Sequence, residues 1–244
     1  MIKVNNVSKC YGSKQAVDDL SFQVEKGEVL AFIGPNGAGK STTMRMITGF
    51  IPISDGTISI NGNDIEKNPL EAKQLIGYLP ENAPLYPQKT VEEFLRFIAD
   101  VRGFKGDEKK EKVENAIKRC FLEPVRHQSI DTLSKGYKHR TCFAQAILHD
   151  PEVLILDEPT DGLDPNQKRE MRNLIKEMGK TKAIIISTHI LEEVEAVGSR
   201  VVLISAGKKV FDGTPEEFKS KSPEGKLADV FYSFTQESIK KEAS

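Results

Sequence analysis

The stretch that decides the fold is Val29-Leu-Ala-Phe-Ile-Gly-Pro-Asn-Gly-Ala-Gly-Lys-Ser41. It begins with five apolar residues, which are typical of a buried strand, and ends in the pattern G-x-x-x-x-G-K-[ST], the phosphate-binding loop. In such a loop, glycines let consecutive backbone N–H groups point at phosphate oxygens, and the N-terminus of the next helix adds partial positive charge. We expect that helix at residues 41–47, ending near Gly49. The stretch therefore predicts a strand, a phosphate-binding loop and a helix in succession.

Three more apolar runs occur downstream, at residues 153–156, 183–186 and 201–204. They are continuous rather than alternating, which is typical of strands buried on both faces of a parallel sheet. A helix is predicted at residues 165–178, with Asp164 as its cap and a proline at its first position. Strands and helices that alternate in this way predict an α/β core with a parallel sheet.

The opening of the chain has a different pattern. Strands are expected at residues 4–7, 20–24 and 57–60, and the Asn61-Gly62 pair that follows the last of them is typical of a hairpin turn. These strands predict a small antiparallel β-subdomain beside the parallel core.

The middle of the chain lacks strand patterns and predicts helices. They are expected from the capping box Thr90-Val-Glu-Glu93 to Gly103, at residues 107–121 and at residues 135–148. A short capped helix at Thr214 and an amphipathic helix around residues 227–234 are expected near the end. We therefore expect an inserted helical subdomain at residues 85–149, and a core with the antiparallel strands and C-terminal helices at residues 1–84 and 150–244.

Two adjacent carboxylates, Asp157 and Glu158, follow the strand predicted at residues 153–156. Buried unpaired charge is costly, so two acids at the end of a buried strand indicate a functional site. One carboxylate can hold Mg²⁺, while its neighbour can orient an attacking water. His189 lies just past the strand predicted at residues 183–186, at the edge of the sheet where α/β proteins bind ligands. These three residues are therefore candidate catalytic and metal-binding residues.

A serine and a glycine stand at the expected start of the helix over residues 135–148, within the run Leu133-Ser-Lys-Gly-Tyr137. A helix N-terminus has free N–H groups and partial positive charge, so it favours anions. Ser134 and Gly136 are therefore candidates for a second contact with phosphate.

Composition excludes several classes of function. The formal net charge of −1 gives no basic footprint, so no nucleic-acid partner is expected. Three cysteines at unrelated spacings form no metal or disulfide pattern, which fits a reducing compartment: Cys10, Cys120 and Cys142. We find no signal peptide and no apolar run long enough for a transmembrane segment, so we expect a soluble protein that reaches membranes only through a partner. The other histidines form no cluster and are expected at the surface or at helix caps: His127, His139 and His149.

Together, these motifs resemble the nucleotide-binding subunits of ATP-binding-cassette (ABC) transporters, over essentially residues 1–238. The likeness matches residues 34–42 to the Walker A loop, residues 153–158 to Walker B and residues 133–137 to the family signature sequence. It also matches residues 161–164 to the D-loop, His189 to the switch histidine and Tyr11 to the aromatic residue that stacks on adenine.

The resemblance implies an ATPase on a P-loop NTPase core, with ATP and Mg²⁺ as cofactors. The ATP-binding residues that it implies are Tyr11, Gly34, Pro35, Asn36, Gly37, Ala38, Gly39, Lys40, Ser41 and Thr42. It assigns catalysis to Glu158 and His189, metal binding to Ser41, Glu81 and Asp157, and a D-loop role to Asp164. It further implies a head-to-tail dimer that sandwiches two ATP molecules, with Ser134 and Gly136 of each copy facing the nucleotide of the other.

The resemblance also implies polytopic membrane permease subunits as partners, through which the dimer would drive export. The chain would then lie at the cytoplasmic face of the inner or plasma membrane, in contact with the permease around residues 81–86 and the helical insertion. The likeness is greatest to the ABC-2 export group, and within it to the gliding-motility and sodium-export type. The transported substrate is not encoded in this chain, because the membrane subunits select it.

Two positions depart from the family pattern. The signature has S-K-G-Y in place of the common S-G-G-Q, so that Tyr137 replaces the glutamine that usually contacts the ribose. Ser134 and Gly136 are kept, and with them the expected phosphate contact. Glu81 stands where the family usually has the glutamine of its Q-loop. Its carboxylate still offers an oxygen to Mg²⁺ but adds a negative charge beside a polyphosphate.

Two other interpretations remain open at this point. One is a single-cassette ABC ATPase in a non-transport role such as cofactor assembly. A DNA-maintenance member is disfavoured, because only 93 residues separate Lys40 from Leu133 and they show no sustained heptads. The other is a P-loop kinase or GTPase, which would turn over as a monomer and would not explain Ser134 and Gly136.

Overall fold

The strands of the computed structural model, which describes residues 1–82, 84–222 and 225–242, form two sheets. The larger sheet consists of β3 (Val29–Ile33), β6 (Ile76–Leu79), β7 (Val153–Asp157), β8 (Ala183–Thr188), β9 (Arg200–Ser205) and β10 (Lys208–Gly213). Their order across the sheet is β10-β9-β3-β8-β7-β6, and all neighbours are parallel except β9 and β10. The predicted parallel pairing of the four apolar runs is therefore confirmed.

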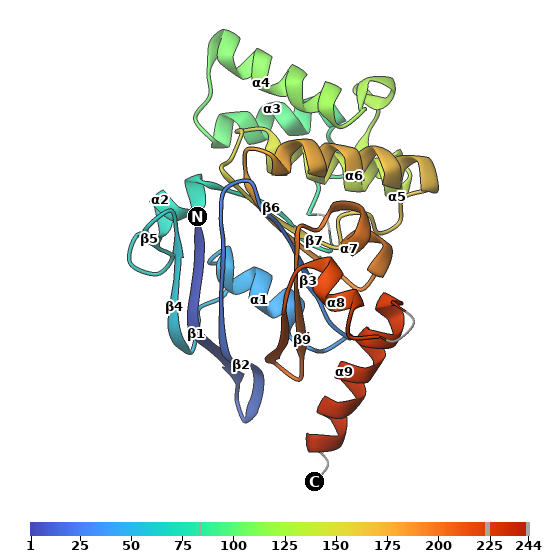
Figure 1. Ribbon diagram of the computed structural model, residues 1–244. Helices are drawn as coiled ribbons and strands as arrows, with labels where there is room; N and C mark the ends of the chain where they lie inside the picture. The colour runs from blue at the N-terminus through green and yellow to red at the C-terminus, as the bar shows by residue number, and fades with distance from the viewer. Residues whose placement is uncertain (83, 223–224, 243–244) are drawn as a thin grey trace.

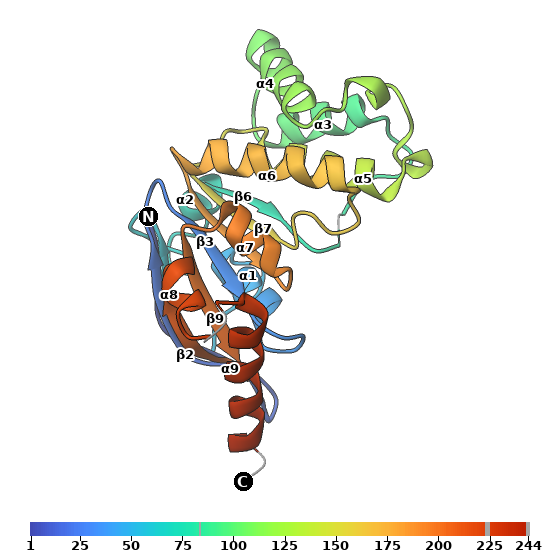
Figure 2. The same ribbon diagram turned by 45° about the vertical axis from the view of Figure 1, so that its right-hand side comes forward.

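The central strands of this sheet are buried on both faces, as their continuous apolar sequences predict. Leu30 and Phe32 of β3 belong to the same apolar cluster as the buried residues of α1 (Lys40–Ile47), whereas Ala31 and Ile33 pack on the opposite face. Helix α1 lies between the two sheets (Figures 1 and 2) and contacts strands of both. This packing fixes the loop between β3 and α1 at the carboxyl end of the larger sheet.

The smaller sheet is antiparallel and covers the other side of α1. In order across the sheet, its strands are β2 (Lys14–Val24), β1 (Ile2–Tyr11), β4 (Asp55–Ile60) and β5 (Asn63–Asp64). Asn61 and Gly62, between β4 and β5, have positive φ angles of 50° and 85°. Two successive positive φ angles are the conformation of a two-residue hairpin turn, so the predicted hairpin is confirmed.

Three helices from the middle of the chain lie in the upper part of the molecule in Figures 1 and 2: α3 (Val91–Val101), α4 (Gly106–Arg119) and α5 (Lys135–Ile147). Thr90 and Glu93 form the predicted capping box, in which each side chain accepts a hydrogen bond from the backbone N–H of the other. Apolar residues of all three helices belong to the same cluster as one face of the larger sheet. The helices therefore extend the core of the sheet.

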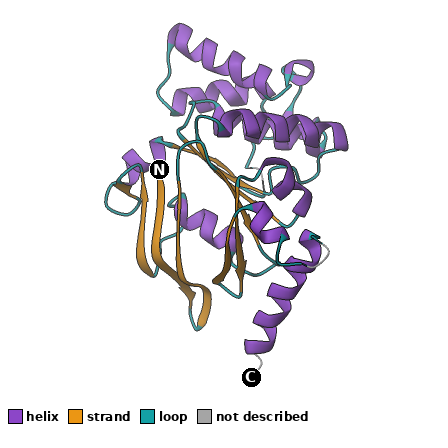
Figure 3. Cartoon of the chain, viewed as in Figure 1, coloured by secondary structure: helices purple, strands orange, loops and turns teal. Residues whose placement is uncertain are grey.

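The remaining helices are α2 (Pro69–Gln74), α6 (Pro165–Gly179), α7 (Leu191–Val197), α8 (Pro215–Lys219) and α9 (Leu227–Glu242), shown with the others in purple in Figure 3. Asp164 caps α6 as predicted, because its Oδ1 accepts hydrogen bonds from the N–H groups of Asn166 and Gln167, at 2.9 and 3.0 Å. None of the described helices combines the length and apolarity needed to cross a lipid bilayer.

Candidate active site

Most of the predicted site residues line one pocket of about 570 Å³, where β3, β6, β7 and β8 end. The predicted residues that line it are Tyr11, Asn36, Gly37, Gly39, Lys40, Ser41, Thr42, Glu81, Glu158 and His189. Gly34, Pro35, Ala38 and Asp157 do not line it, and neither do Ser134, Gly136 and Asp164. The structure therefore brings the loop, Glu158 and His189 together, and places the signature residues elsewhere.

The loop before α1 is shaped by close backbone contacts. Gly39 has a φ of 105°, and a Cβ there would lie 2.6 Å from the carbonyl oxygen of Ala16, so only glycine fits. Lys40 is buried, and its Nζ donates hydrogen bonds to the carbonyl oxygens of Gly34 and Pro35, at 2.7 and 3.2 Å. Burial lowers the pKa of Lys40, whereas Glu158 and other nearby carboxylates oppose that shift. A bound polyphosphate would supply further negative charge for this ammonium group.

The two carboxylates at the end of β7 have different surroundings. Asp157 is buried and accepts a hydrogen bond from the hydroxyl of Ser187 on β8. Glu158 has a φ of 53°, which non-glycine residues rarely adopt and which is often found at functional sites. Its Oε1 lies 2.9 Å from Nδ1 of His189, and its Oε2 lies 3.4 Å from Oγ1 of Thr188. Only Glu158 of the two lines the pocket, where it can orient a water.

Burial raises the pKa of Glu158, and the hydrogen bond and charge of His189 are the main effects that oppose this shift. A carboxylate acts as a base only when deprotonated, so activity should fall as pH drops through a pKa above the ordinary value of 4.5. Removing the opposing effect in His189→Ala should raise that pKa further. As the pH is lowered, we therefore expect the residual ATPase activity of His189→Ala to decline at a higher pH than the activity of the wild-type protein.

The measurement is the ATPase rate against pH for the unchanged chain, for His189→Ala and for the control His127→Ala, whose side chain is exposed. If the ATPase rate of all three proteins declines at the same low pH, His189 does not influence the pKa of Glu158.

The predicted metal ligands are oxygen donors, the type that Mg²⁺ prefers. Ser41 and Glu81 line the pocket, whereas Asp157 lies behind it with one carboxylate oxygen held by Ser187. Within the described part of the chain, no three His, Cys, Asp or Glu residues are grouped closely enough to hold a metal ion by themselves. The residues therefore fit a magnesium ion whose remaining ligands come from phosphate or water.

The signature residues lie at the N-terminus of α5. Ser134 is exposed and caps the helix, because its Oγ accepts a hydrogen bond from the N–H of Tyr137 at 3.3 Å. Gly136 is buried, and a Cβ there would lie 2.5 Å from Oε1 of Gln167. This helix end lies outside the pocket of its own chain.

One prediction is wrong, and three residues that line the pocket were not among the predicted site residues: Lys14, Ala16 and Asp161. His139 is neither exposed nor a helix cap: it lies inside α5 and is 5% exposed. Burial lowers its pKa, although the carboxylate of Asp161 opposes that shift. Asp161 itself lines the pocket, and its position three residues after Glu158 was the available signal.

Comparisons with known proteins agree with this geometry. The family model described as "ABC transporter" matches residues 17–161. The linearmycin resistance ATP-binding protein LnrL of Bacillus subtilis (strain 168) is 36% identical over 222 residues, which are 91% of this chain and 71% of LnrL. The ABC transporter ATP-binding protein NatA of the same strain is 34% identical over 239 residues, which are 96% of this chain and 97% of NatA.

A solved structure of an ATP-binding subunit of an ABC transporter superposes with a TM-score of 0.86 at 30% identity, covering 96% of this chain and 99% of the other. The chain belongs to the ABC transporter family, as one of its ATP-binding subunits. It is an ATPase, and the predicted P-loop NTPase core is confirmed.

Proposed function

We propose that two copies of this chain form a head-to-tail dimer around two Mg²⁺–ATP, and that ATP binding and hydrolysis drive export through separate membrane subunits. The dimer is supported by one observation: the predicted site residues lie in two separate places on a single chain. Lys40, Glu158 and His189 share one pocket, whereas the exposed Ser134 and the buried Gly136 lie at the start of α5, outside it. A second copy related by two-fold symmetry would bring the missing half to each pocket.

Within each pocket, the residues take the roles that their positions allow. Lys40 and the N-terminus of α1 bind the phosphates, and Tyr11, which is half exposed at the rim, offers a ring for adenine. Ser41, Glu81 and Asp157 would hold Mg²⁺, which when bound would neutralise charge on the phosphates. Glu158 orients the attacking water, and His189 keeps its carboxylate in place. Asp164 fixes the D-loop by capping α6.

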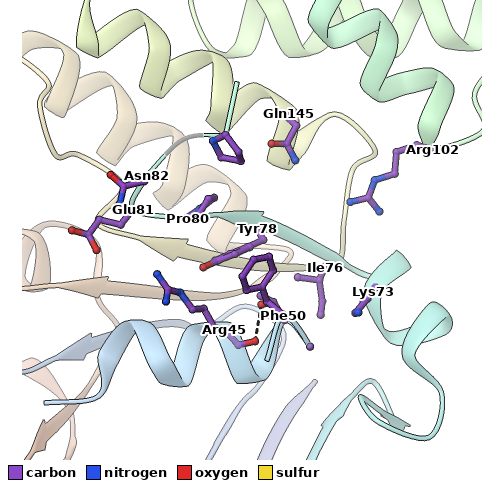
Figure 4. Close-up of a pocket in the computed structure, with 13 residues that line it drawn as sticks. Arg45, Phe50, Lys73, Ile76, Tyr78, Pro80, Glu81, Asn82, Arg102 and Gln145 are labelled. Carbon is purple, nitrogen blue, oxygen red and sulfur yellow. Dashed lines mark hydrogen bonds between the residues drawn. The ribbon is translucent and has the colours of Figure 1, made fainter. Parts of the chain in front are cut away.

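A groove of about 640 Å³ is the surface that we propose for the membrane subunit (Figure 4). Arg45 and Phe50 line one side of it, Arg102 and Gln145 lie on the other, and Tyr78 lies between them. Phe50 is large, apolar and 74% exposed, so its side chain is available for a contact in the groove. The groove also includes Glu81, at the edge of the ATP pocket, so a segment docked here would touch a residue of the catalytic site.

The groove separates the two parts that we propose for the chain. Arg45 and Phe50 belong to the core of residues 1–84 and 150–244, and Arg102 and Gln145 belong to the helical insertion of residues 85–149. Export is supported by the name of LnrL, a resistance protein, because resistance fits removal of a compound. With a permease docked in the groove, the chain would lie at the cytoplasmic face of the membrane.

The test is an affinity pull-down of the full chain from detergent-solubilised membranes of its own source, with mass spectrometry of the bound proteins. We expect a stoichiometric polytopic membrane protein, and its loss with Phe50→Asp. The matched control is Tyr232→Asp on α9, because Tyr232 is also a large exposed residue, at 65%. Recovery of only non-membrane proteins, with ATP-dependent dimerisation intact, would favour a non-transport role such as cofactor assembly.

A further inference from the structure

The turn that carries the base Glu158, residues 158–161, is held by neighbouring helices on two sides. We call these four residues the base turn. The N–H of Asp161 donates a hydrogen bond to the carbonyl oxygen of Glu158 at 3.1 Å, and Glu158 has a left-handed backbone conformation. A conformation that non-glycine residues rarely adopt persists only where surrounding contacts determine it. The contacts that hold the base turn therefore also hold the base.

On one side, Lys135 of α5 holds the base turn. Its Nζ lies 2.7 Å from Oδ2 of Asp161, and the hydrogen bond from Lys135 is the main cause that lowers the pKa of Asp161. The lysine stem passes over Gly162, where a Cβ would lie 2.6 Å from Cδ and Cε of Lys135. The charge and the stem of Lys135 therefore contact residues three and four positions after Glu158.

On the other side, α7 holds the base turn. The hydroxyl of Thr160 donates a hydrogen bond to Oε1 of Glu193, which is a buried residue four positions after His189. The base turn therefore lies between the helix that begins at the signature residues and the helix that follows the switch histidine.

Lys135 has an unusual position for a cation. It is the first residue of α5, a helix with no acidic residue in its first turn, and positive charge is unfavourable at a helix N-terminus. The second lysine of that turn, Lys138, instead donates to the backbone carbonyl of Asp131 at 3.0 Å, outside the base turn. The carboxylate of Asp161 offsets the unfavourable position of Lys135, so the pair couples the start of α5 to the base turn.

We propose that Lys135 is a positioning residue for ATP hydrolysis: through Asp161, it transmits the orientation of the signature end of α5 to the catalytic base Glu158. This inference rests on the proposed role of Glu158. The coupling acts within one chain, so the docking of a second copy at Ser134 would change the geometry of the base in the chain that contributes Ser134. Hydrolysis in one pocket would then depend on whether the signature end of the same chain is engaged.

The test is steady-state ATPase kinetics of the full chain with Lys135→Met, Lys135→Arg, Asp161→Asn and the matched control Lys138→Met. We expect Lys135→Met and Asp161→Asn to lower kcat about tenfold or more with little change in KM, because a small misplacement of a catalytic group is costly. Lys135→Arg should keep most of the rate, since it retains a cation for Asp161, and Lys138→Met should be unchanged. The exchanged pair Lys135→Asp with Asp161→Lys should recover rate lost in either single variant.

Three results would overturn the inference. An exchanged pair no faster than the single variants would show that Lys135 and Asp161 do not act through their contact. A raised KM for ATP with unchanged kcat would show that Lys135 acts on the nucleotide rather than on Asp161. Unchanged kinetics of Lys135→Met would show that the pair has no role. An error in the proposed role of Glu158 can be distinguished from an error in this inference. It would appear as normal ATP hydrolysis by Glu158→Gln, independently of the results for the Lys135 variants.

Discussion

Replacing Glu158 by glutamine is expected to slow ATP hydrolysis about 100-fold or more, because a positioned general base typically contributes 10²–10⁴ to the rate. Glutamine has nearly the same shape and can keep a hydrogen bond to His189, but it cannot accept a proton from water. ATP binding should persist, since Lys40 and the loop before α1 are unchanged. With hydrolysis blocked, the variant should accumulate as an ATP-bound dimer.

Single-turnover hydrolysis and size-exclusion chromatography with ATP and Mg²⁺ measure the two effects. Glu192→Gln on α7 is the matched control, because it makes the same change of charge at an exposed residue outside the pocket. A Glu158→Gln protein that remains monomeric at saturating ATP would contradict the dimer. One that hydrolyses at the normal rate would contradict the role of Glu158.

Replacing Ser134 by arginine is expected to abolish hydrolysis while each chain still binds ATP. Ser134 is exposed at the start of α5 and does not line the pocket of its own chain, so the long side chain has room in a single chain. In the dimer, the same side chain would occupy the place where the γ-phosphate of the other copy meets the helix. The loss should therefore appear in turnover and in ATP-dependent dimerisation.

The helix cap is also lost in this variant, and this effect must be separated from the first. Loss of a serine cap costs about 1 kcal/mol, which lowers the Tm of a domain of this size by roughly 2–4 °C. Thermal unfolding measures this contribution, and ATP binding by fluorescence titration measures the pocket. Unchanged turnover in Ser134→Arg would show that one chain carries a complete site.

Elements with strong local chemistry could be predicted from the sequence. The loop before α1 was predictable because glycine, lysine and serine at fixed spacing carry the phosphate-binding function, and the buried strands because their apolar runs are unbroken. The cap at Asp164 was predictable because a capping residue and the first helical residue are adjacent in sequence.

Strands with weaker patterns were not predicted. The edge strand β10 is mostly polar and pairs only with β9, so it has no apolar run. Strand β6 has only four residues, and its side chains pack beneath α5, which lies far away in sequence. Both owe their structure to partners that a local pattern does not contain.

The burial of His139 and the pairing of Lys135 with Asp161 could not be predicted for a related reason. His139 is buried because α5 is covered on most sides, by β6, α3 and α4 among others, and this follows from tertiary packing rather than from neighbouring residues. Lys135 and Asp161 are 26 positions apart, and only the fold brings them together. Residue type indicated the chemistry of the site, but long-range contacts decide which residues support it.

The exposed position of Ser134 has a consequence for mixtures of defective chains. In a mixed dimer of Ser134→Arg and Glu158→Gln, the pocket of the first chain keeps its own Glu158 and faces the intact Ser134 of the second. The other pocket carries both defects. One pocket of the mixed pair therefore keeps both its base and an intact signature serine, although the coupling of Lys135 to Asp161 would lower its rate, because the signature end of the same chain carries Ser134→Arg. The capacity to hydrolyse ATP thus belongs to the interface rather than to either chain.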